Sequence, residues 1–316
     1  MKKNRRKAGV KLVAAVLTLL LGYGGIQLSS LMGGNVPQGQ KTGTSKPVET
    51  TRKKTDQTAK GEMEVTFLDV GQGDCTIIRT EGHAMMVDAG TNKAGSKVAE
   101  YLQEENVQSL DYLILTHPDA DHIGGGDNVL ESVEVQKVLM LDLENDTKTY
   151  EEVIRDIEKY RVEKEYPSAG EVYELGDASF TILCPQAGET YDKGARGVSV
   201  GIRLTHGEKS FVLCGDAEEA EEKKMVERFG NTLECDVLKC GHHGSRTATC
   251  EAFLKATDPT WAVISCGEGN SYGHPHAEVL ARLEDEDVQV YRTDWLGTIT
   301  AVSDGKQISW KSEKKP

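Results

Sequence analysis

Hydrophobic and polar positions predict a mixed α and β domain that begins near residue 62. Short stretches in which apolar and polar residues alternate are typical of strands, and apolar residues at intervals of three and four are typical of helices. The predicted strands are residues 64–70, 75–79, 83–87, 110–115, 135–141, 171–174, 179–183, 198–205, 210–214, 237–239, 261–265, 288–292, 298–302 and 307–310. The predicted helices are residues 96–103, 127–132, 150–160, 217–229, 250–256 and 277–283.

Strand-rich blocks occur in both halves of this region, with helices between and after them. Sheets at the centre with helices on the outer faces bury the apolar side of each element, so we expect sheets sandwiched between helices. No clear linker divides residues 62–316, which predicts one domain. The two halves share an order of elements without a sequence repeat.

The first 61 residues have a different composition. An apolar run at Leu12–Leu21, which continues more weakly to Leu31, follows six cations: Lys2, Lys3, Arg5, Arg6, Lys7 and Lys11. This pattern predicts a signal-anchor in residues 1–34 that spans a membrane once, with the basic end cytoplasmic and the rest of the chain outside. Cleavage followed by secretion is the alternative. Residues 35–61, rich in Gly, Thr, Gln, Lys and Pro, are predicted to form a flexible cationic linker.

The first 60 residues and the rest of the chain also differ in charge. Residues 1–60 hold 12 of the 37 Lys and Arg residues and 2 of the 51 Asp and Glu residues, so the other 256 residues carry 25 basic against 49 acidic side chains. An acidic domain of this kind repels long polyanions, and two divalent ions return only four positive charges. The balance argues against a nuclease that grips long DNA through its backbone.

The seven cysteines do not form a disulfide framework. No two are spaced as Cys-x-x-Cys, and Cys214 and Cys266 fall in predicted strands, where we expect them to pack as small buried hydrophobic residues. Free thiols on an exported domain favour a reducing or anaerobic setting.

The densest chemistry lies in Thr116–Gly125, directly after the apolar run Tyr112–Leu115. Two histidines and two aspartates occupy the six positions from His117 to His122, a density of metal-ligating side chains that neither a core nor a turn requires. A strand that ends in such a loop is typical of one half of a two-metal site. The glycines at 124–126 are expected to let the backbone pass close to the metals and enter a helix.

Histidine spacing supports a single site. Neutral imidazole is the commonest metal ligand and carries protons near neutral pH. Six of the eight histidines form three close pairs along the chain: His117 and His122, His242 and His243, and His274 and His276. Histidines scattered over a surface would not pair in this way.

Five motifs follow one another in a fixed order, and residues 67–74 (FLDVGQGD) precede them. They are Asp88-Ala89-Gly90, Thr116–Gly125, Cys214-Gly215-Asp216, Gly241–Ser245 and Tyr272–His276. In this order they resemble the metallo-β-lactamase fold hydrolases. Over residues 63–310 the chain resembles the ComEC-type competence-protein metallohydrolase domain, in a free-standing form with a single anchor. The resemblance implies an αββα sandwich with the site at the strand ends along one edge.

The resemblance also implies ligands for two divalent metal ions, Mn²⁺ or Zn²⁺. His117 and Asp119 are expected to bind the first ion, and Asp121 and His122 the second. Asp216 is expected to bridge them, because two cations about 4 Å apart need a shared anion.

Two of these expectations have alternatives. His242 is expected to complete the second site and His243 is its alternative, because adjacent residues after a strand point apart. Gly244 and Ser245 then present backbone N–H groups to an anion. For Asp216 the alternative role is an N-cap of the helix that follows.

The chain departs from the family where a third histidine ligand usually lies, between the first loop and Asp216. Residues 194–200 occupy this region. Ser199 is the only match there, and Arg196 either contacts an anionic substrate or lies in solvent. The first site is left with one nitrogen and two carboxylates, which favours Mn²⁺ over Zn²⁺; weak occupancy of this site is the alternative.

Further matching residues are expected around the metals. Asp88 and Asp74 are expected to orient the metal loop by hydrogen bonds. Asp121 and His274 are the predicted catalytic residues, and His274 is placed to bind a phosphoryl oxygen or to protonate a leaving alkoxide. The other positions predicted to orient ligands or to contact substrate are Ser199, His243, Ser245, Asn270, Tyr272 and His276.

The sequence therefore predicts an extracytoplasmic metal-dependent hydrolase, a phosphodiesterase or nuclease that uses a metal-activated hydroxide. By resemblance the substrate is DNA, as in DNA uptake, whereas a smaller phosphodiester fits the acidic domain better. A single anchor forms no DNA channel, so a role in transport requires a separate membrane partner. The alternatives are a hydrolase of lactam, ester or thioester bonds and a non-catalytic surface module with a structural or vestigial metal site.

Overall fold

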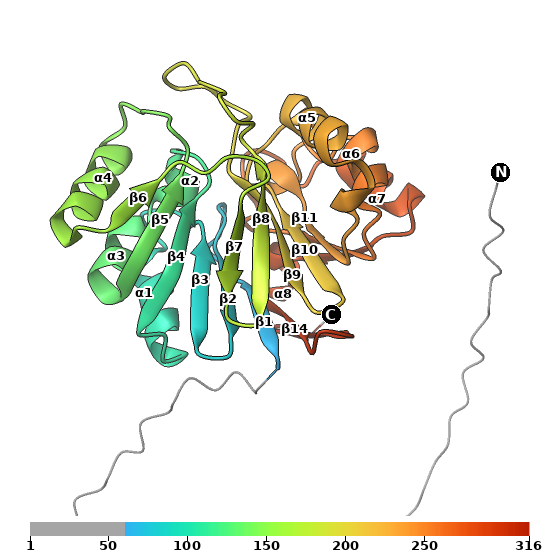
Figure 1. Ribbon diagram of the computed structural model, residues 1–316. Helices are drawn as coiled ribbons and strands as arrows, with labels where there is room; N and C mark the ends of the chain where they lie inside the picture. The colour runs from blue at the N-terminus through green and yellow to red at the C-terminus, as the bar shows by residue number, and fades with distance from the viewer. Residues whose placement is uncertain (1–60, 316) are drawn as a thin grey trace, which may run out of the picture. The chain divides into compact units, whose positions relative to one another are not determined.

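In the computed structural model, which describes residues 61–315, two β-sheets pack face to face (Figure 1). The first sheet has the strand order β15-β14-β1-β2-β3-β4-β5-β6. Strands β3 to β6 run parallel, and the other neighbours are antiparallel. The strands are β1 Met63–Phe67, β2 Thr76–Thr80, β3 His83–Val87, β4 Ser109–Leu115, β5 Glu134–Met140, β6 Glu163–Glu165, β14 Ile299–Ser303 and β15 Ile308–Ser312.

The second sheet has the order β13-β12-β11-β10-β9-β8-β7. Strands β10 to β13 run parallel, whereas β7 to β10 form an antiparallel meander. The strands are β7 Val172–Leu175, β8 Ala178–Cys184, β9 Gly201–His206, β10 Lys209–Leu213, β11 Val237–Lys239, β12 Trp261–Ile264 and β13 Gln289–Arg292. Each sheet therefore contains one parallel block, and the loops that leave these blocks carry the site.

Helices cover the outer face of each sheet (Figure 1). The first sheet is covered by α1 Gly95–Glu104, α2 Ala120–Ile123, α3 Gly126–Ser132 and α4 Lys148–Tyr160. The second is covered by α5 Glu219–Phe229, α6 Glu251–Thr257 and α7 Ala277–Asp285. Shorter turns are the 3₁₀ helices η1 Gly230–Leu233 and η2 Gly241–Gly244, and α8 Thr293–Leu296.

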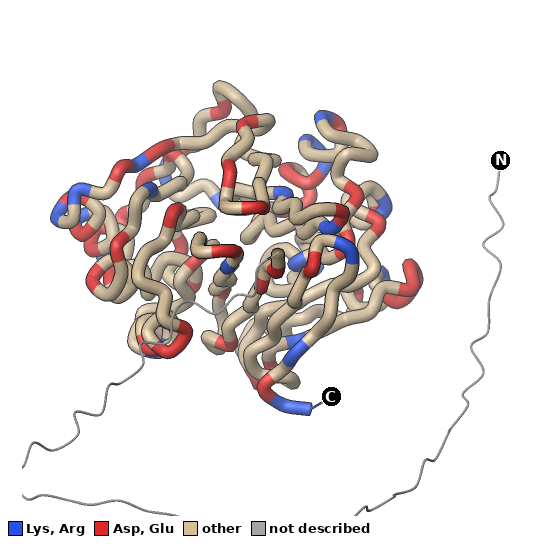
Figure 2. Tube along the Cα trace, turned by 60° about the horizontal axis from the view of Figure 1, so that its bottom comes forward, with Lys and Arg blue, Asp and Glu red and all other residues tan. Residues whose placement is uncertain are grey.

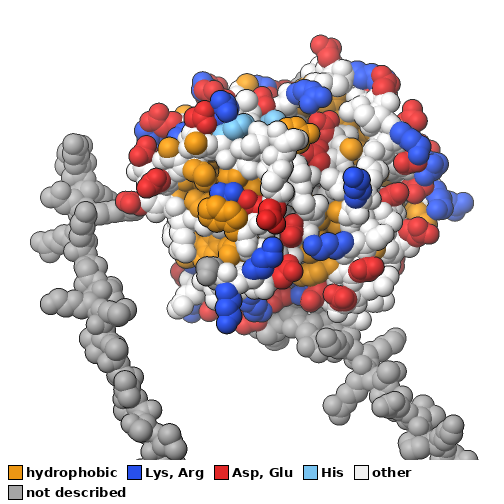
Figure 3. Space-filling model, turned by 180° about the vertical axis from the view of Figure 1, so that it is seen from behind, with side chains coloured by type: hydrophobic (Ala, Val, Ile, Leu, Met, Phe, Trp, Pro, Cys, Tyr) orange, Lys and Arg blue, Asp and Glu red, His pale blue; other side chains and the backbone are white. Residues whose placement is uncertain are grey.

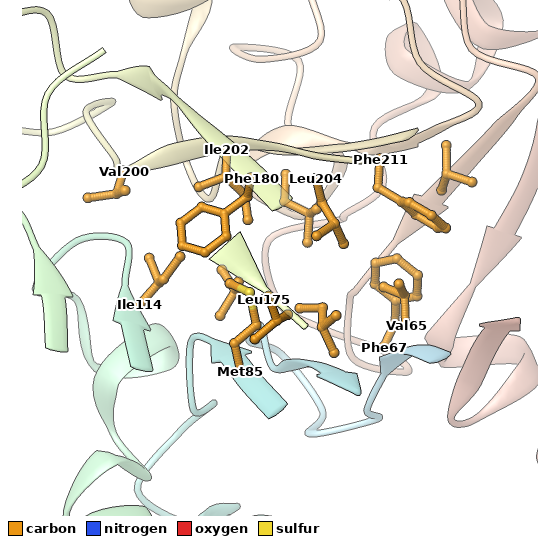
Figure 4. Packing of buried hydrophobic residues seen from close by; sticks show 14 of the residues in the cluster. Val65, Phe67, Met85, Ile114, Leu175, Phe180, Val200, Ile202, Leu204 and Phe211 are labelled. Carbon is orange, nitrogen blue, oxygen red and sulfur yellow. The ribbon is translucent and has the colours of Figure 1, made fainter. Parts of the chain in front are cut away.

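The main core lies between the two sheets (Figure 4). Side chains on a strand alternate between its faces, so Ile202 and Leu204 both point from β9 toward the first sheet. Phe180 of β8 lies at the centre of this layer, with its ring 5.2 Å from Tyr112 and 5.1 Å from Tyr173. The opposite faces of both sheets are buried under helices, which explains why strands such as β4 end in an uninterrupted apolar run.

The predicted αββα sandwich is confirmed. Five short elements were not predicted from the sequence, namely β6, α2, η1, η2 and α8, because three or four residues are too few to show a period. All seven cysteines lie within the described residues, where they are buried and unpaired as expected.

The predicted signal-anchor, and the predicted linker up to residue 60, lie outside the described residues. Within residues 61–315 no helix is both long and apolar enough to cross a membrane.

The position of Phe180 predicts a large loss of stability on truncation. Phe180 is completely buried between the sheets, so we expect Phe180→Ala to lower the free energy of unfolding by about 3–5 kcal/mol, measured by urea denaturation. Val172 of the same meander is 60% exposed, and Val172→Ala should change stability by less than about 0.5 kcal/mol. Equal effects of the two substitutions would contradict the two-sheet core.

Candidate metal centre

The site is built from loops that follow parallel strands of both sheets. Asp88 follows β3 and His117 follows β4 in the first sheet. Asp216 follows β10, and His242 and His243 follow β11, in the second sheet. The packing of the sheets brings these segments, far apart in sequence, to one place.

Asp88 holds the first loop in position. Its backbone has a positive φ of 58°, and its carboxylate accepts hydrogen bonds from the N–H of Thr116 at 2.8 Å and the Thr116 hydroxyl at 2.7 Å. The same carboxylate lies 2.8 Å from Nδ1 of His122. One buried aspartate therefore fixes the end of β4 and the ring of His122, as expected of an orienting residue.

The loop after β4 turns His117 and His122 inward and leaves Asp119 at its rim. His122 is fully buried and His117 is 8% exposed. Asp121 points to the second sheet, where its Oδ2 lies 3.3 Å from Nε2 of His243. Asp119 begins α2, and its carboxylate lies 3.8 Å from the exposed guanidinium of Arg196.

The glycines of this loop serve packing rather than an approach to metal. A side chain at Gly124 would come within 2.3 Å of the backbone of Asn92, and one at Gly125 within 2.4 Å of the Ala89 carbonyl oxygen. The loop therefore lies directly against the turn that follows β3. As expected, the backbone then enters a helix, α3.

The carboxylate of Asp216 lies between two groups of side chains. Its Oδ1 is 3.2 Å from Nε2 of His122 and 3.7 Å from Nε2 of His243. Its Oδ2 is 3.7 Å from Nε2 of His117 and 3.4 Å from Nε2 of His242. Asp216 is not the N-cap of α5, which is Glu218, so the structural alternative does not hold.

Gly215 explains how Asp216 reaches this position. Gly215 has a φ of 50°, and a side chain there would come within 2.6 Å of the Thr116 hydroxyl and 2.8 Å of the Ser199 hydroxyl. Glycine thus allows the end of β10 to approach the end of β4 closely. Ser199 then accepts a hydrogen bond from the N–H of Asp216 at 2.9 Å.

Both His242 and His243 face the centre, in contrast to the expectation that only one does. That expectation holds for extended backbone, in which successive side chains point to opposite faces. Here both residues are in the left-handed region, with φ of 49° and 54°, so the strict alternation is lost. His243 Nε2 lies on the side of Asp121 and His122, and His242 Nε2 lies on the Oδ2 side of Asp216 with His117.

The four imidazoles share one orientation, in which Nε2 faces Asp216 and Nδ1 faces a group behind the ring. The Nδ1 partners are the Thr116 hydroxyl at 3.1 Å from His117, Asp88 at 2.8 Å from His122, Glu218 at 3.2 Å from His242 and the Ser265 carbonyl at 3.1 Å from His243. Carboxylates and carbonyls only accept, and the Thr116 hydroxyl donates its own hydrogen to Asp88, so Nδ1 carries a hydrogen in each ring and Nε2 is the nitrogen that can bind an ion at the centre. Metal-binding histidines typically show this arrangement.

The donor set fits a divalent cation. Asp74, His122, Asp216 and His243 form a buried group whose candidate ligand atoms lie within 4.8 Å of one another, and three of its members, His122, Asp216 and His243, face the centre. Oδ1 of Asp216 is buried and has no hydrogen-bond partner among residues 61–315. Burial alone would raise the pKa of Asp216, but His122 and His243 hold it well below its usual range. The centre therefore holds a buried anion that requires positive charge.

Protons and metal ions compete for the same nitrogens. Burial lowers the pKa of His243, yet Asp216 and Asp74 outweigh it and raise that pKa to about 9. Without an ion the imidazolium balances Asp216, and binding of an ion to Nε2 displaces that proton.

Asp74 lies behind His243 rather than in the centre. Its Oδ1 is 3.3 Å from Nδ1 of His243, on the ring edge that faces away from Asp216. Its Oδ2 accepts from the ammonium group of Lys239 at 2.8 Å, and both side chains are buried. Burial would raise the pKa of Asp74, but Lys239 and His243 hold it well below its usual range. Asp74 thus orients His243.

Sequence reasoning missed Lys239. It lies in β11 among apolar residues, three positions before His242, and its charge alone was the available signal. A lysine inside a three-residue buried strand needs an anion, and Asp74 supplies it.

The region of the missing third histidine contributes Ser199 but no imidazole. His206, farther along β9, is buried away from the centre, with Nδ1 2.9 Å from the Ser303 hydroxyl. On the Oδ2 side of Asp216 the nitrogen beside His117 comes instead from His242.

The loop before α7 forms one wall of the centre. Asn270 organises it: its side-chain oxygen accepts from the N–H groups of Tyr272 and His274, and its amide donates to the carbonyl of His274. The ring of His274 lies 5.7 Å from that of His242 and 6.1 Å from that of His243.

Two other predicted residues have structural partners. Ser245 does not offer its N–H to an anion, because that group donates to the His242 carbonyl at 2.8 Å. His276 occupies the N-cap position of α7, but its Nδ1 accepts from the N–H of Arg246 at 3.0 Å.

The Lys239 and Asp74 pair generates a prediction about metal binding. Lys239→Met leaves Asp74 buried without its cation, so we expect the free energy of unfolding to fall by about 3–5 kcal/mol. Because His243 loses its fixed orientation, we expect metal affinity measured by calorimetry to fall about 10- to 100-fold. Adding Asp74→Asn to Lys239→Met removes both charges and should restore part of the stability. Unchanged metal affinity in Lys239→Met would contradict the orienting role.

The centre lies within a region that matches a known family. The model of the metallo-beta-lactamase superfamily matches residues 68–268. ComE operon protein 3 of Bacillus subtilis (strain 168) is 32% identical over 256 residues, which cover 75% of this chain and 33% of that protein. Recombination protein 2 of Haemophilus influenzae is 32% identical over 248 residues, which cover 77% of this chain and 29% of that protein. Competence protein ComA of Neisseria gonorrhoeae is 29% identical over 241 residues, which cover 76% of this chain and 32% of that protein.

The chain thus spans about a third of the length of these curated relatives. Among solved structures, a mutant of the β-hydroxylase CmlA superposes with a TM-score of 0.51 and 15% identity over 75% of this chain and 53% of that one, which supports the fold alone. The family match takes in every strand-end residue described above, from Asp74 to Ser265. The chain therefore belongs to the metallo-β-lactamase superfamily.

Proposed function

We propose that this protein is a metal-dependent phosphodiesterase in which two divalent ions share Asp216. One observation carries this proposal: the two oxygens of a single buried carboxylate face two separate groups of imidazole nitrogens. Residues that hold two divalent ions a few ångströms apart would supply a site that binds both the attacking and the leaving oxygen of a phosphoryl group.

We assign three candidate ligands to each side of Asp216. The first ion would be held by His117 and His242, with Asp119 at the rim. The second would be held by His122, His243 and Asp121. His242, which the sequence predicted at the second ion, is assigned here to the first ion, where it replaces the absent third histidine. Mixed nitrogen and oxygen ligands suit both Mn²⁺ and Zn²⁺.

Bound ions would supply Lewis-acid polarisation and an activated water molecule. The ring of His274 lies near those of both His242 and His243. Burial, together with His243, His276 and His242, lowers the pKa of His274 to about 4, so the ring is neutral near pH 7. The side-chain oxygen of Gln72 accepts from the N–H of Gly267, which leaves the amide nitrogen of Gln72 facing Nδ1 of His274 at 3.5 Å. This nitrogen can only donate, so Nδ1 accepts. The hydrogen therefore lies on Nε2, which suits His274 to bind a phosphoryl oxygen rather than to release a proton.

Two observations bear on the substrate. Two relatives are named for competence and for recombination, processes whose substrate is DNA. Against a grip on long DNA stands the acidic balance of this domain, and in the view of Figure 2 Lys and Arg do not gather into a stripe. A nucleotide, or the end of a nucleic acid, fits both observations better than an internal stretch of duplex.

We propose that residues 62–316 lie outside the cytoplasm, held by the N-terminal segment, and that any transport of DNA depends on a separate membrane partner. The basic and apolar pattern of residues 1–34 motivates this placement. Protease added to intact cells should then degrade the domain while a cytoplasmic marker survives. A domain that is cut only after lysis would contradict the placement.

The hydrolytic function is tested with bis(p-nitrophenyl) phosphate. We expect the metal-stripped protein to gain turnover when Mn²⁺ or Zn²⁺ is restored, and His117→Ala and Asp216→Asn each to lose at least about 100-fold, because each removes a metal contact. His83 is exposed on β3, away from the centre, and His83→Ala should keep full activity. His242→Ala and His243→Ala should each lower the number of ions bound per chain.

The other outcomes discriminate between the alternatives. Two ions bound per chain without turnover would contradict phosphodiester chemistry and favour lactam, ester or thioester substrates. A chain that binds neither ion would favour a non-catalytic surface module.

A further inference from the structure

An aromatic side chain stands exposed at the wall of the metal centre. Tyr272 is 64% exposed, and its backbone is held by Asn270, whose side-chain oxygen accepts from the Tyr272 N–H at 3.2 Å. The same asparagine fixes His274. The position of Tyr272 relative to His274 is therefore set by the loop itself. Histidine surface lies at the upper edge of the face in Figure 3, with hydrophobic surface beside it.

The ring of Tyr272 continues a series of ring contacts that leads to the metal ligands. It is stacked on His274 with 5.6 Å between the ring centres and 24° between the planes. His274 is in turn stacked on His243 with 6.1 Å and 29°. Nε2 of His243 faces Asp216. A single side chain, His274, therefore lies between the exposed ring of Tyr272 and a ligand of the proposed metal centre.

Tyr272 differs from the other exposed aromatic side chains of residues 61–315. Lys159 lies over the ring of Tyr160, Lys164 over that of Tyr166 and Arg292 over that of Trp295. No cation lies over the ring of Tyr272 within these residues, and its ring contact is with His274. A large aromatic face left open next to a candidate active site is the feature that a flat ligand requires.

Charge favours stacking as the mode of recognition. The acidic balance of the domain opposes binding through phosphate charge. Stacking of a base on an aromatic ring needs no net charge and works for every base.

We propose that Tyr272 is the platform for the nucleobase of a nucleotide whose phosphodiester lies at the metal centre. This inference rests on the proposed phosphodiesterase function and names the substrate class: a nucleoside phosphodiester recognised by its base.

The test compares two esters with the same leaving group, thymidine 5′-(p-nitrophenyl phosphate) and methyl p-nitrophenyl phosphate. Any stacking of the nitrophenyl ring is common to both, so the ratio of their kcat/KM values reports the contribution of the nucleoside. In the full-length metal-loaded protein we expect Tyr272→Ala to lower this ratio about 5- to 150-fold, mainly through KM. Tyr272→Phe, which keeps the ring, should keep the ratio.

Tyr160→Ala is the matched control, because Tyr160 is also exposed but lies at the end of α4, outside the metal centre. It should keep the ratio. A Tyr272→Ala ratio equal to that of the unchanged protein would overturn the proposal, as would an equal loss in Tyr160→Ala.

Binding separates this proposal from the hydrolytic function. Calorimetry with thymidine 5′-monophosphate and with methyl phosphate needs no turnover. Tighter binding of the nucleotide that is lost in Tyr272→Ala and kept in Tyr272→Phe would support the platform even if no ester is hydrolysed. Equal affinity for the two ligands would overturn it even if the esterase reaction proceeds.

Discussion

The structure depends on the buried negative charge of Asp216. A carboxylate removed from water is unfavourable unless opposite charge is held beside it, and here four imidazoles from two loops converge on its two oxygens. Each ring is fixed from behind by an acceptor in its own part of the fold. The two sheets must therefore pack in register for the charge to be balanced, and a cation at Nε2 would stabilise the site and the sandwich together.

Much of this fold could be predicted from the sequence because its strands are buried on both faces. An uninterrupted apolar run such as the one at the end of β4 predicts a buried strand. The motifs that follow such runs consist of residues that are neighbours in the sequence. The metal loop, Asp88 and Asp216 were placed by such local signals, and the structure brings them together. The boundaries of long helices such as α4 were predicted to within about two residues, since their period is clear.

What the sequence could not supply depends on backbone geometry and long-range charge. The left-handed conformation of His242 and His243 turns both rings to the centre, and no residue pattern announces it, because non-glycine residues rarely adopt it. Lys239 and Asp74 are separated by 165 positions, so their pairing exists only once the two sheets have packed. Such strained or buried features concentrate at functional sites, where the surrounding fold holds them.

In the proposed function, the acidic surface and the exposed tyrosine both favour ligands with few phosphates. Electrostatic repulsion grows with every phosphate that a ligand brings near the domain, whereas stacking acts on one base at a time. A long nucleic acid would be repelled at many phosphates and would gain one stacking contact at Tyr272. A nucleotide or a strand end gains the same contact with few phosphates. If the proposed function holds, the balance of these two terms, rather than the metal chemistry that the superfamily shares, sets which phosphodiesters this protein favours.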